Sequence, residues 1–161
     1  IIHALAEETG ESVVLATLVD GRRKAVLRAT SYQLLRVDPS VEKHTAMFEL
    51  VTGRVLAAFA IPEELEEIIR VNGLPGKLWK GIKDRETLIK ELKIIRERGM
   101  DEERLAERGI ASFSVPVMGE GGQILAAIGI HLPSFRADEE HMVNIRTAAQ
   151  KAAMRLESIL K

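Results

Sequence analysis

Apolar residues in the first quarter of the chain are spaced as β-strands require. Residues 12–19 are apolar at both alternating positions, a pattern typical of an interior strand that is covered on both faces. Residues 22–29 alternate between small or apolar and charged side chains, and the Asp20-Gly21 pair between the two segments is a hairpin turn signal. The pattern therefore predicts a β-hairpin, and we expect a third strand over residues 30–37.

The hydrophobic period becomes helical after residue 38. Apolar residues recur three and four positions apart, which predicts helices over residues 48–59, 62–72 and 85–98. Pro62 suits the first turn of the second of these helices, Asp84 can cap the third, and Gly99 is expected to end it. The chain also opens on what reads as the end of a helix, with Gly10 in the terminating position.

The last third of the chain predicts a second hairpin and a long helix. Strands are expected over residues 110–118 and 123–132, joined by a glycine-rich loop, and residues 138–161 carry a helical seam of apolar residues. The order strands, helices, strands, helix is that of an α+β domain with a mostly antiparallel sheet. A length of 161 residues fits one domain, so residues 1–161 are interpreted as a single unit.

Charge and composition exclude several classes of function. Lys and Arg number 23 and Asp and Glu 24, for a net charge of -1, whereas a domain that grips a nucleic-acid backbone needs a basic surface. The absence of cysteine excludes disulfides, thiol nucleophiles and cysteine zinc sites. The apolar stretches are too short to span a bilayer. The chain starts at Ile1 rather than at a methionine, so we expect it to be cut from a longer protein.

The second hairpin predicts a polar sheet face. If Met118 lies opposite Gln123, Ser112 lies opposite Gly129, with His131 as its diagonal neighbour. The period of two then places a set of small or polar residues on one face: Ser112, Ser114, Gly129 and His131. Such a face suits a small ligand. The alternative is that Gly129 marks a bulge or a close helix approach and that the serines bond to the backbone.

The Thr52-Gly53-Arg54 sequence interrupts an apolar helix. A glycine inside a helix costs about 1 kcal/mol relative to alanine, so its presence indicates close backbone approach or an irregular helix start. If the helix begins near Thr52, its free N–H groups would suit a carboxylate. The alternative is that Gly53 only packs against a strand.

Catalytic and metal chemistry are less favoured. Ser112 with His131 and a nearby carboxylate imitates a nucleophilic triad, so a small Ser/His-dependent hydrolase or transferase is the alternative function. The chain has no G-x-S-x-G turn to expose the serine, and its four histidines show no metal-ligand spacing. We therefore expect neither an enzyme nor a metal or other cofactor.

Several segments, in their order and spacing, resemble one family of bacterial and archaeal proteins. The segments are residues 50–58 (LVTGRVLAA) with 61–65 (IPEEL), residues 91–99 (ELKIIRERG), and residues 109–117 (GIASFSVPV) with 122–130 (GQILAAIGI). Together they resemble the effector-binding domain of transcriptional regulators of the isocitrate-lyase-regulator (IclR) type, over nearly the whole chain.

The resemblance implies a GAF/PAS-like α+β fold, an antiparallel sheet with helices on both faces, and one cavity for a small-molecule effector. It also implies a cytoplasmic regulator that forms homodimers or homotetramers and binds DNA through an N-terminal winged helix-turn-helix, which this chain lacks. Carried over residue by residue, the family's pocket positions are Leu34, Val37, Val51, Thr52, Gly53, Glu102, Ser112, Gly129 and His131.

A mode of binding follows from these positions. Thr52, Ser112 and main-chain N–H groups would hold the polar end of the ligand, which we expect to be a carboxylate, and the aliphatic residues would cover its apolar part. Trp79, on the glycine-rich loop over residues 72–83, is interpreted either as a lid or as a core anchor.

Overall fold

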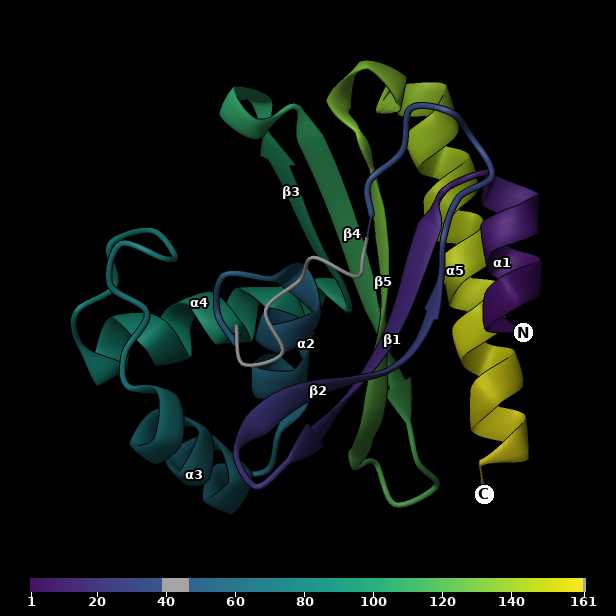
Figure 1. The fold of residues 1–161 in the computed structure, drawn as a ribbon. Helices are drawn as coiled ribbons and strands as arrows, with labels where there is room; N and C mark the ends of the chain where they lie inside the picture. Colours follow the sequence, from purple (N-terminus) through teal and green to yellow (C-terminus); the bar gives the residue numbers. More distant parts are fainter. Residues whose placement is uncertain (39–46, 161) are drawn as a thin grey trace.

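The computed structural model describes residues 1–38 and 47–160, which form a five-stranded antiparallel sheet between two groups of helices (Figure 1). The strand order is β2-β1-β5-β4-β3. The strands are β1 (Ser12–Val19), β2 (Arg22–Ala29), β3 (Asp101–Leu105), β4 (Ile110–Met118) and β5 (Ile124–Pro133). Every neighbouring pair is antiparallel, as the predicted α+β class requires.

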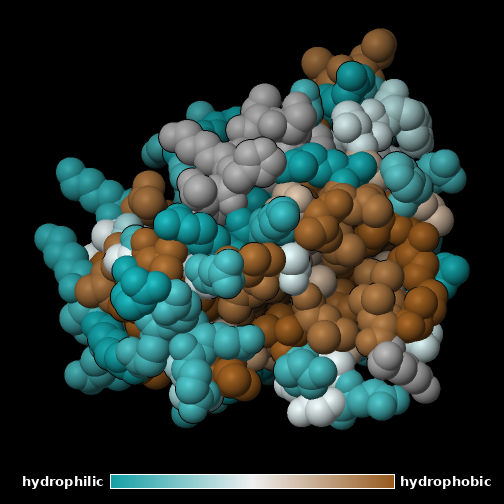
Figure 2. Space-filling model, turned by 60° about the horizontal axis from the view of Figure 1, so that its bottom comes forward, coloured by the Kyte–Doolittle hydropathy of each residue, from teal (hydrophilic) through white to brown (hydrophobic). Residues whose placement is uncertain are grey.

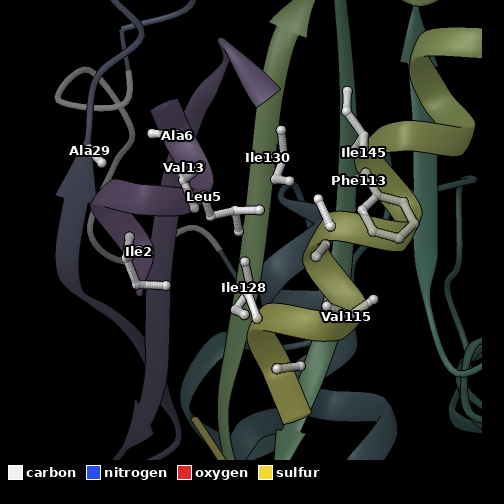
Figure 3. Packing of buried hydrophobic residues seen from close by; sticks show 14 of the residues in the cluster. Ile2, Leu5, Ala6, Val13, Ala29, Phe113, Val115, Ile128, Ile130 and Ile145 are labelled. Atoms are coloured by element: carbon white, nitrogen blue, oxygen red, sulfur yellow. The ribbon is translucent and has the colours of Figure 1, made fainter. Parts of the chain in front are cut away.

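The helices cover both faces of this sheet. On one face lie α1 (Ile2–Thr9) and α5 (Glu139–Ile159), which share a core cluster with residues such as Phe113 and Ile130 (Figures 1 and 3). On the other lie α2 (Val51–Phe59), α3 (Pro62–Asn72) and α4 (Arg85–Arg98), which form a second cluster with Ala16 and Ala127. Two short 3-10 turns, η2 (Ala106–Arg108) and η3 (Ser134–Arg136), connect strands to their neighbours. The predicted arrangement of helices on both faces is confirmed.

Local signals set most helix ends. Gly10 and Gly99 adopt left-handed φ angles of 72° and 71° at the ends of α1 and α4, a conformation that glycine adopts without steric cost. The Asp84 carboxylate accepts a hydrogen bond from the Thr87 N–H at 2.8 Å and so caps α4, as predicted. The first helix after residue 38 begins at Val51 rather than at residue 48.

The predicted third strand over residues 30–37 is wrong: these residues form bends and no strand. Side chains at the end of the first hairpin replace the main-chain ladder there. The Ser12 hydroxyl accepts from the Ser31 N–H at 3.0 Å and donates to the Val37 carbonyl at 2.5 Å, and the Ser31 hydroxyl donates to the Gly10 carbonyl at 2.6 Å. The third strand along the chain is instead β3, a charged segment whose pattern does not predict a strand.

The register of the second hairpin differs from the predicted one by two residues. Its loop closes one residue later, with Met118 opposite Ile124, and a further irregularity between Val117 and Met118 adds a second shift. Ser112 therefore pairs with His131, and Ser114 pairs with Gly129. Because two single shifts restore the parity of a strand, the predicted set of residues still shares one face.

Candidate functional site

A row of polar side chains crosses the sheet face that α2 covers. Ser12 on β1, His131 on β5, Ser112 on β4 and Glu103 on β3 are successive partners in the register. The Ser112 hydroxyl and the His131 Nδ1 atom lie 2.9 Å apart and form a hydrogen bond. Ser12, His131 and Ser112 are 0%, 4% and 8% exposed. We call these four residues the polar row.

A second row lies beside it, where Ser114 pairs with both Gly129 and Asp101. Ser114 is fully buried, and within residues 1–38 and 47–160 its hydroxyl has no hydrogen-bond partner. An unsatisfied buried hydroxyl is costly, because it loses its bonds to water without replacement. Ser114 therefore retains a hydrogen-bonding capacity that a ligand or an ordered water can use.

The gap left by the missing side chain of Gly129 is filled by α2. A Cβ atom at this position would lie 2.5 Å from the Thr52 Cγ2 methyl group, far inside contact distance. Thr52 is fully buried, and its hydroxyl accepts a hydrogen bond from the Arg23 Nε at 2.6 Å, which fixes the side chain. Gly129 thus permits a close helix approach, one of the two alternatives that the sequence left open.

Gly129→Ala is expected to lower the free energy of unfolding by about 1–3 kcal/mol, because the added methyl group overpacks the contact with Thr52. The Thr52→Ser variant removes the obstructing methyl group but keeps the hydroxyl that Arg23 requires. Urea titration of the two single variants and the double variant measures the coupling between them. If Thr52→Ser does not reduce the cost of Gly129→Ala, the contact is not the cause.

The N-terminus of α2 is held tightly against the chain that precedes it. The helix begins at Val51, close to the start predicted near Thr52. A Cβ atom on Gly53 would lie 1.7 Å from the Met47 carbonyl oxygen, which excludes any side chain there. Gly53 therefore allows two backbone segments to approach closely. The segment it approaches is the main chain at Met47, not a strand.

An ion-pair cluster around a buried arginine lies beside the polar row, and the sequence pattern did not predict it. Arg54 on α2 is 2% exposed, its Nε lies 2.9 Å from the Asp101 carboxylate, and its terminal nitrogens donate to Glu103 at 3.1 and 2.9 Å. Burial raises the pKa of Asp101, while the charge of Arg54 opposes the rise. We call Arg54, Asp101 and Glu103 the arginine cluster. The sequence signal for this cluster is Arg54 itself, because a charged residue inside an apolar helix needs an oppositely charged partner.

Trp79 packs against this cluster. Its ring is 5% exposed, lies parallel to Phe48 with centroids 6.3 Å apart, and faces the Arg54 guanidinium at 5.2 Å. Its position is that of a core anchor. Beyond it, a polar cavity of about 730 Å³ is lined by the arginine cluster and by residues such as Lys80 and Arg108.

The structure brings some of the predicted pocket residues together and separates others. Val51, Thr52 and Gly53 lie at the start of α2, above the face that carries Ser112, Gly129 and His131. The Val37 carbonyl reaches the end of the polar row through its bond with Ser12.

Leu34 and Glu102 lie elsewhere. Leu34 is 98% exposed. Glu102 pairs with Phe113, whose side chain belongs to the core under α5, and its carboxylate accepts from Arg146 at 2.8 and 3.0 Å. Alternation along β3 thus directs Glu102 to the opposite face from the polar row, whereas its neighbours Asp101 and Glu103 face α2.

The described parts of the chain offer neither a metal site nor a membrane-spanning helix. Over residues 1–38 and 47–160, no three His, Asp or Glu side chains are grouped so that they could hold a metal ion. In the same residues, no helix is both long and apolar enough to cross a membrane.

Solved structures of transcriptional regulators share this fold. The C-terminal domain of the Escherichia coli regulator KdgR superimposes with a TM-score of 0.76 at 21% identity, over 98% of this chain and 92% of that one. An IclR transcriptional regulator from Alicyclobacillus acidocaldarius superimposes with a TM-score of 0.80 at 21% identity, over 98% of this chain and 64% of that one.

The family model described as "Bacterial transcriptional regulator IclR C-terminal" matches residues 1–158, and the chain belongs to this family. The HTH-type transcriptional regulator KdgR of Dickeya chrysanthemi is 25% identical over 154 residues, which are 92% of this chain and 50% of that protein.

The curated relatives are longer than this chain, and their names bear on the prediction that it is not an enzyme. The chain spans between 45% and 62% of the length of the curated relatives it matches. These relatives are named as regulators, in agreement with the non-enzymatic assignment, and the Ser/His hydrolase alternative is not favoured.

Proposed function

We propose that this chain is the effector-binding domain of a cytoplasmic transcriptional regulator, and that it binds a small metabolite between the polar row and the start of α2. The observation that carries the proposal is the buried pair of Ser112 and His131 beside the unsatisfied hydroxyl of Ser114. Structural positions in a core are normally apolar, so a group of polar side chains buried around an unused hydroxyl is typical of a ligand site.

The charges around the polar row support a carboxylate-bearing effector. Arg54 pairs with both Asp101 and Glu103 and offsets one of their two negative charges. Arg23, at 1% exposure, lies behind Thr52 and donates to its hydroxyl. The first-turn N–H groups of α2 add partial positive charge at the same place. In this proposal Ser112 and Ser114 donate to the carboxylate and Val51 covers the hydrocarbon part.

Ser112→Val is expected to weaken binding of a carboxylate effector by at least about tenfold, since it removes a hydrogen-bond donor and leaves the His131 ring nitrogen without the hydroxyl. The probe is a panel of small aliphatic and aromatic carboxylates, screened by thermal shift and measured by calorimetry. Ser158→Val, a serine exposed on α5, is the matched control. Equal affinity of the two variants, or a panel without any binder, contradicts the proposed site.

We further propose that effector binding alters self-association and thereby the geometry of the DNA-binding domains of the whole regulator. Figure 2 shows a broad apolar area on the side where the β1–β2 hairpin and the end of α5 lie. Exposed apolar side chains on these elements are Val19, Val26, Leu27, Ile159 and Leu160, at 36% to 68% exposure. In the described part of the chain, β2 is also an edge strand with one unpaired side. An apolar area beside an open strand edge suits a second copy of the chain.

Val26→Asp is expected to weaken self-association by at least about tenfold, because it places a charge in the middle of an apolar contact. Val143→Asp, at 49% exposure on α5 against 52% for Val26, is the control. Sedimentation velocity, with and without a carboxylate that binds, measures the oligomer distribution. A distribution that neither Val26→Asp nor the ligand changes contradicts the coupling.

A further inference from the structure

A second hollow, separate from the polar row, lies where the end of α2 meets α3 and α4. It has a volume of about 610 Å³ and is lined mainly by small and aliphatic residues. Ala57, Ala58 and Ala60 form its floor and are buried, whereas Ile89 at its edge is 42% exposed. We call this hollow the α2–α4 groove. Small side chains at the floor leave room above them, and the volume falls within the range of small-molecule sites.

Positive charge predominates at the rim of the groove. Arg85, Lys93 and Arg96 line it, against the single carboxylate of Glu97. Arg85 pairs with Glu66, and Lys93 lies 3.7 Å from Glu97. No acidic side chain in residues 1–38 or 47–160 forms an ion pair with Arg96, so its charge is not offset in this way.

The position of Arg96 is fixed by the end of α2. Its Nε donates to the Ala58 carbonyl at 2.7 Å and one terminal nitrogen, Nη2, donates to the Ala60 carbonyl at 3.0 Å. These bonds satisfy carbonyls that a helix end leaves without an intrahelical partner. The other terminal nitrogen, Nη1, makes no hydrogen bond within the described residues. A rigid cation with a spare donor therefore stands at the edge of an apolar hollow.

We propose that the α2–α4 groove binds an amphipathic monocarboxylate, a molecule with a hydrocarbon body and one anionic end. The hydrocarbon body covers the alanine floor and contacts Ile89 and Leu65, and the carboxylate meets Arg96 and Lys93. A fully polar metabolite would not bury the apolar lining, and a cationic ligand would meet like charge at the rim. No residue of this groove belongs to the polar row, so the site is additional to the proposed effector site.

Octanoate is the probe, titrated into the 161-residue chain by calorimetry. One octanoate is expected to bind per chain, more tightly than butanoate because more hydrocarbon is buried. Octylamine, which has a similar tail and the opposite charge, is expected not to bind. Absence of octanoate binding, or equal binding of octylamine, overturns the proposal.

Three variants of α4 locate the site. Ile89→Asp and Ile94→Asp place the same charge at similarly exposed isoleucines, 42% and 39%, but only Ile89 lines the groove. Ile89→Asp and Lys93→Glu are each expected to weaken octanoate binding by at least about tenfold, and Ile94→Asp to change it less than about twofold. Equal losses at Ile89 and Ile94 overturn the proposal. Loss of octanoate binding in Ser112→Val also overturns it, and assigns the ligand to the polar row instead.

Discussion

Replacing Arg54 by methionine is expected to lower the free energy of unfolding by about 3–5 kcal/mol, because two carboxylates would remain near the core without their cation. Arg54 is the most buried charged partner of Asp101 and Glu103, at 2% exposure, and it also contacts the face of Trp79. Methionine preserves much of the side-chain volume, so the loss measures charge pairing rather than a cavity. Urea titration followed by circular dichroism gives the free energy.

A matched control uses a second arginine with two acidic partners. Arg146 binds Glu102 and Glu139 but is 25% exposed, so water screens its pairs. Arg146→Met is expected to cost about 1 kcal/mol or less. Adding Asp101→Asn and Glu103→Gln to Arg54→Met should restore part of the lost stability, since the unpaired charges are then absent. Equal costs for Arg54→Met and Arg146→Met would show that burial of the arginine cluster is unimportant.

The cost of Arg54→Met is also expected to depend on pH. Burial raises the pKa of Asp101 above its ordinary value of 3.8, and the loss of Arg54 would raise that pKa further. A carboxyl whose folded pKa is raised stabilises the fold fully below its unfolded pKa, and this stability is lost as the pH rises through the folded pKa. The difference between wild type and Arg54→Met should therefore be smaller at about pH 4.5 than at about pH 7. A difference that does not change with pH contradicts this assignment.

Local rules predicted most elements of this fold, because most elements carry their own signals. The 12–19 and 22–29 segments have strand periodicity and a turn between them, and Gly10, Asp84 and Gly99 mark helix ends through single-residue chemistry. The face of the second hairpin was also predictable, although its register was not. Two single-residue shifts cancel in parity, and neither is visible as a pattern of side chains.

The errors occur where tertiary contacts override local pattern. β3 consists largely of charged residues, so its sequence shows no alternation of apolar and polar positions. Its side chains alternate between two arginine partners instead, Arg54 on one face of the sheet and Arg146 on the other. The 30–37 segment has strand-like composition, yet Leu34 is 98% exposed and side-chain bonds from Ser12 and Ser31 direct the chain away from the sheet. Strand propensity reflects packing against neighbours, and within the described residues this segment forms no main-chain ladder with a strand.

The candidate site was predictable only in part for the same reason. The polar face follows from alternation, but the filling of the Gly129 gap by Thr52 depends on where α2 lies, and periodicity does not determine that position. Likewise, Glu102 matched a pocket position of the family by sequence. The direction of its side chain depends on its place in β3, which was not predicted to be a strand. Alternation thus predicts which residues share the polar face, whereas the contacts of each side chain depend on the elements packed against it.

Gly53→Ala is expected to lower the free energy of unfolding by about 3 kcal/mol or more, because the new methyl group would overlap the Met47 carbonyl oxygen, 1.7 Å away. The sign of the effect is informative. In an unobstructed helix, replacing glycine by alanine is favourable by about 1 kcal/mol through helix propensity. Relief of the overlap would require the chain at Met47 to move away from α2, which also carries the Thr52 contact with the sheet. Urea titration measures the free energy, and near-ultraviolet circular dichroism reports on Trp79, which packs against Phe48 in the same segment.

Ala57→Gly, in the same helix, is the control for helix propensity. It lowers the helix propensity of α2, whereas Gly53→Ala raises it. If close approach to Met47 is the reason for glycine at position 53, both variants are destabilised although they change helix propensity in opposite senses. The loss in Gly53→Ala should also be accompanied by an altered Trp79 signal, whereas Ala57→Gly should leave that signal close to wild type. A Gly53→Ala variant that is as stable as wild type, or more stable, would mean that the start of α2 is not held by the preceding chain, and the proposed position of its N–H groups above the polar row would lose its support.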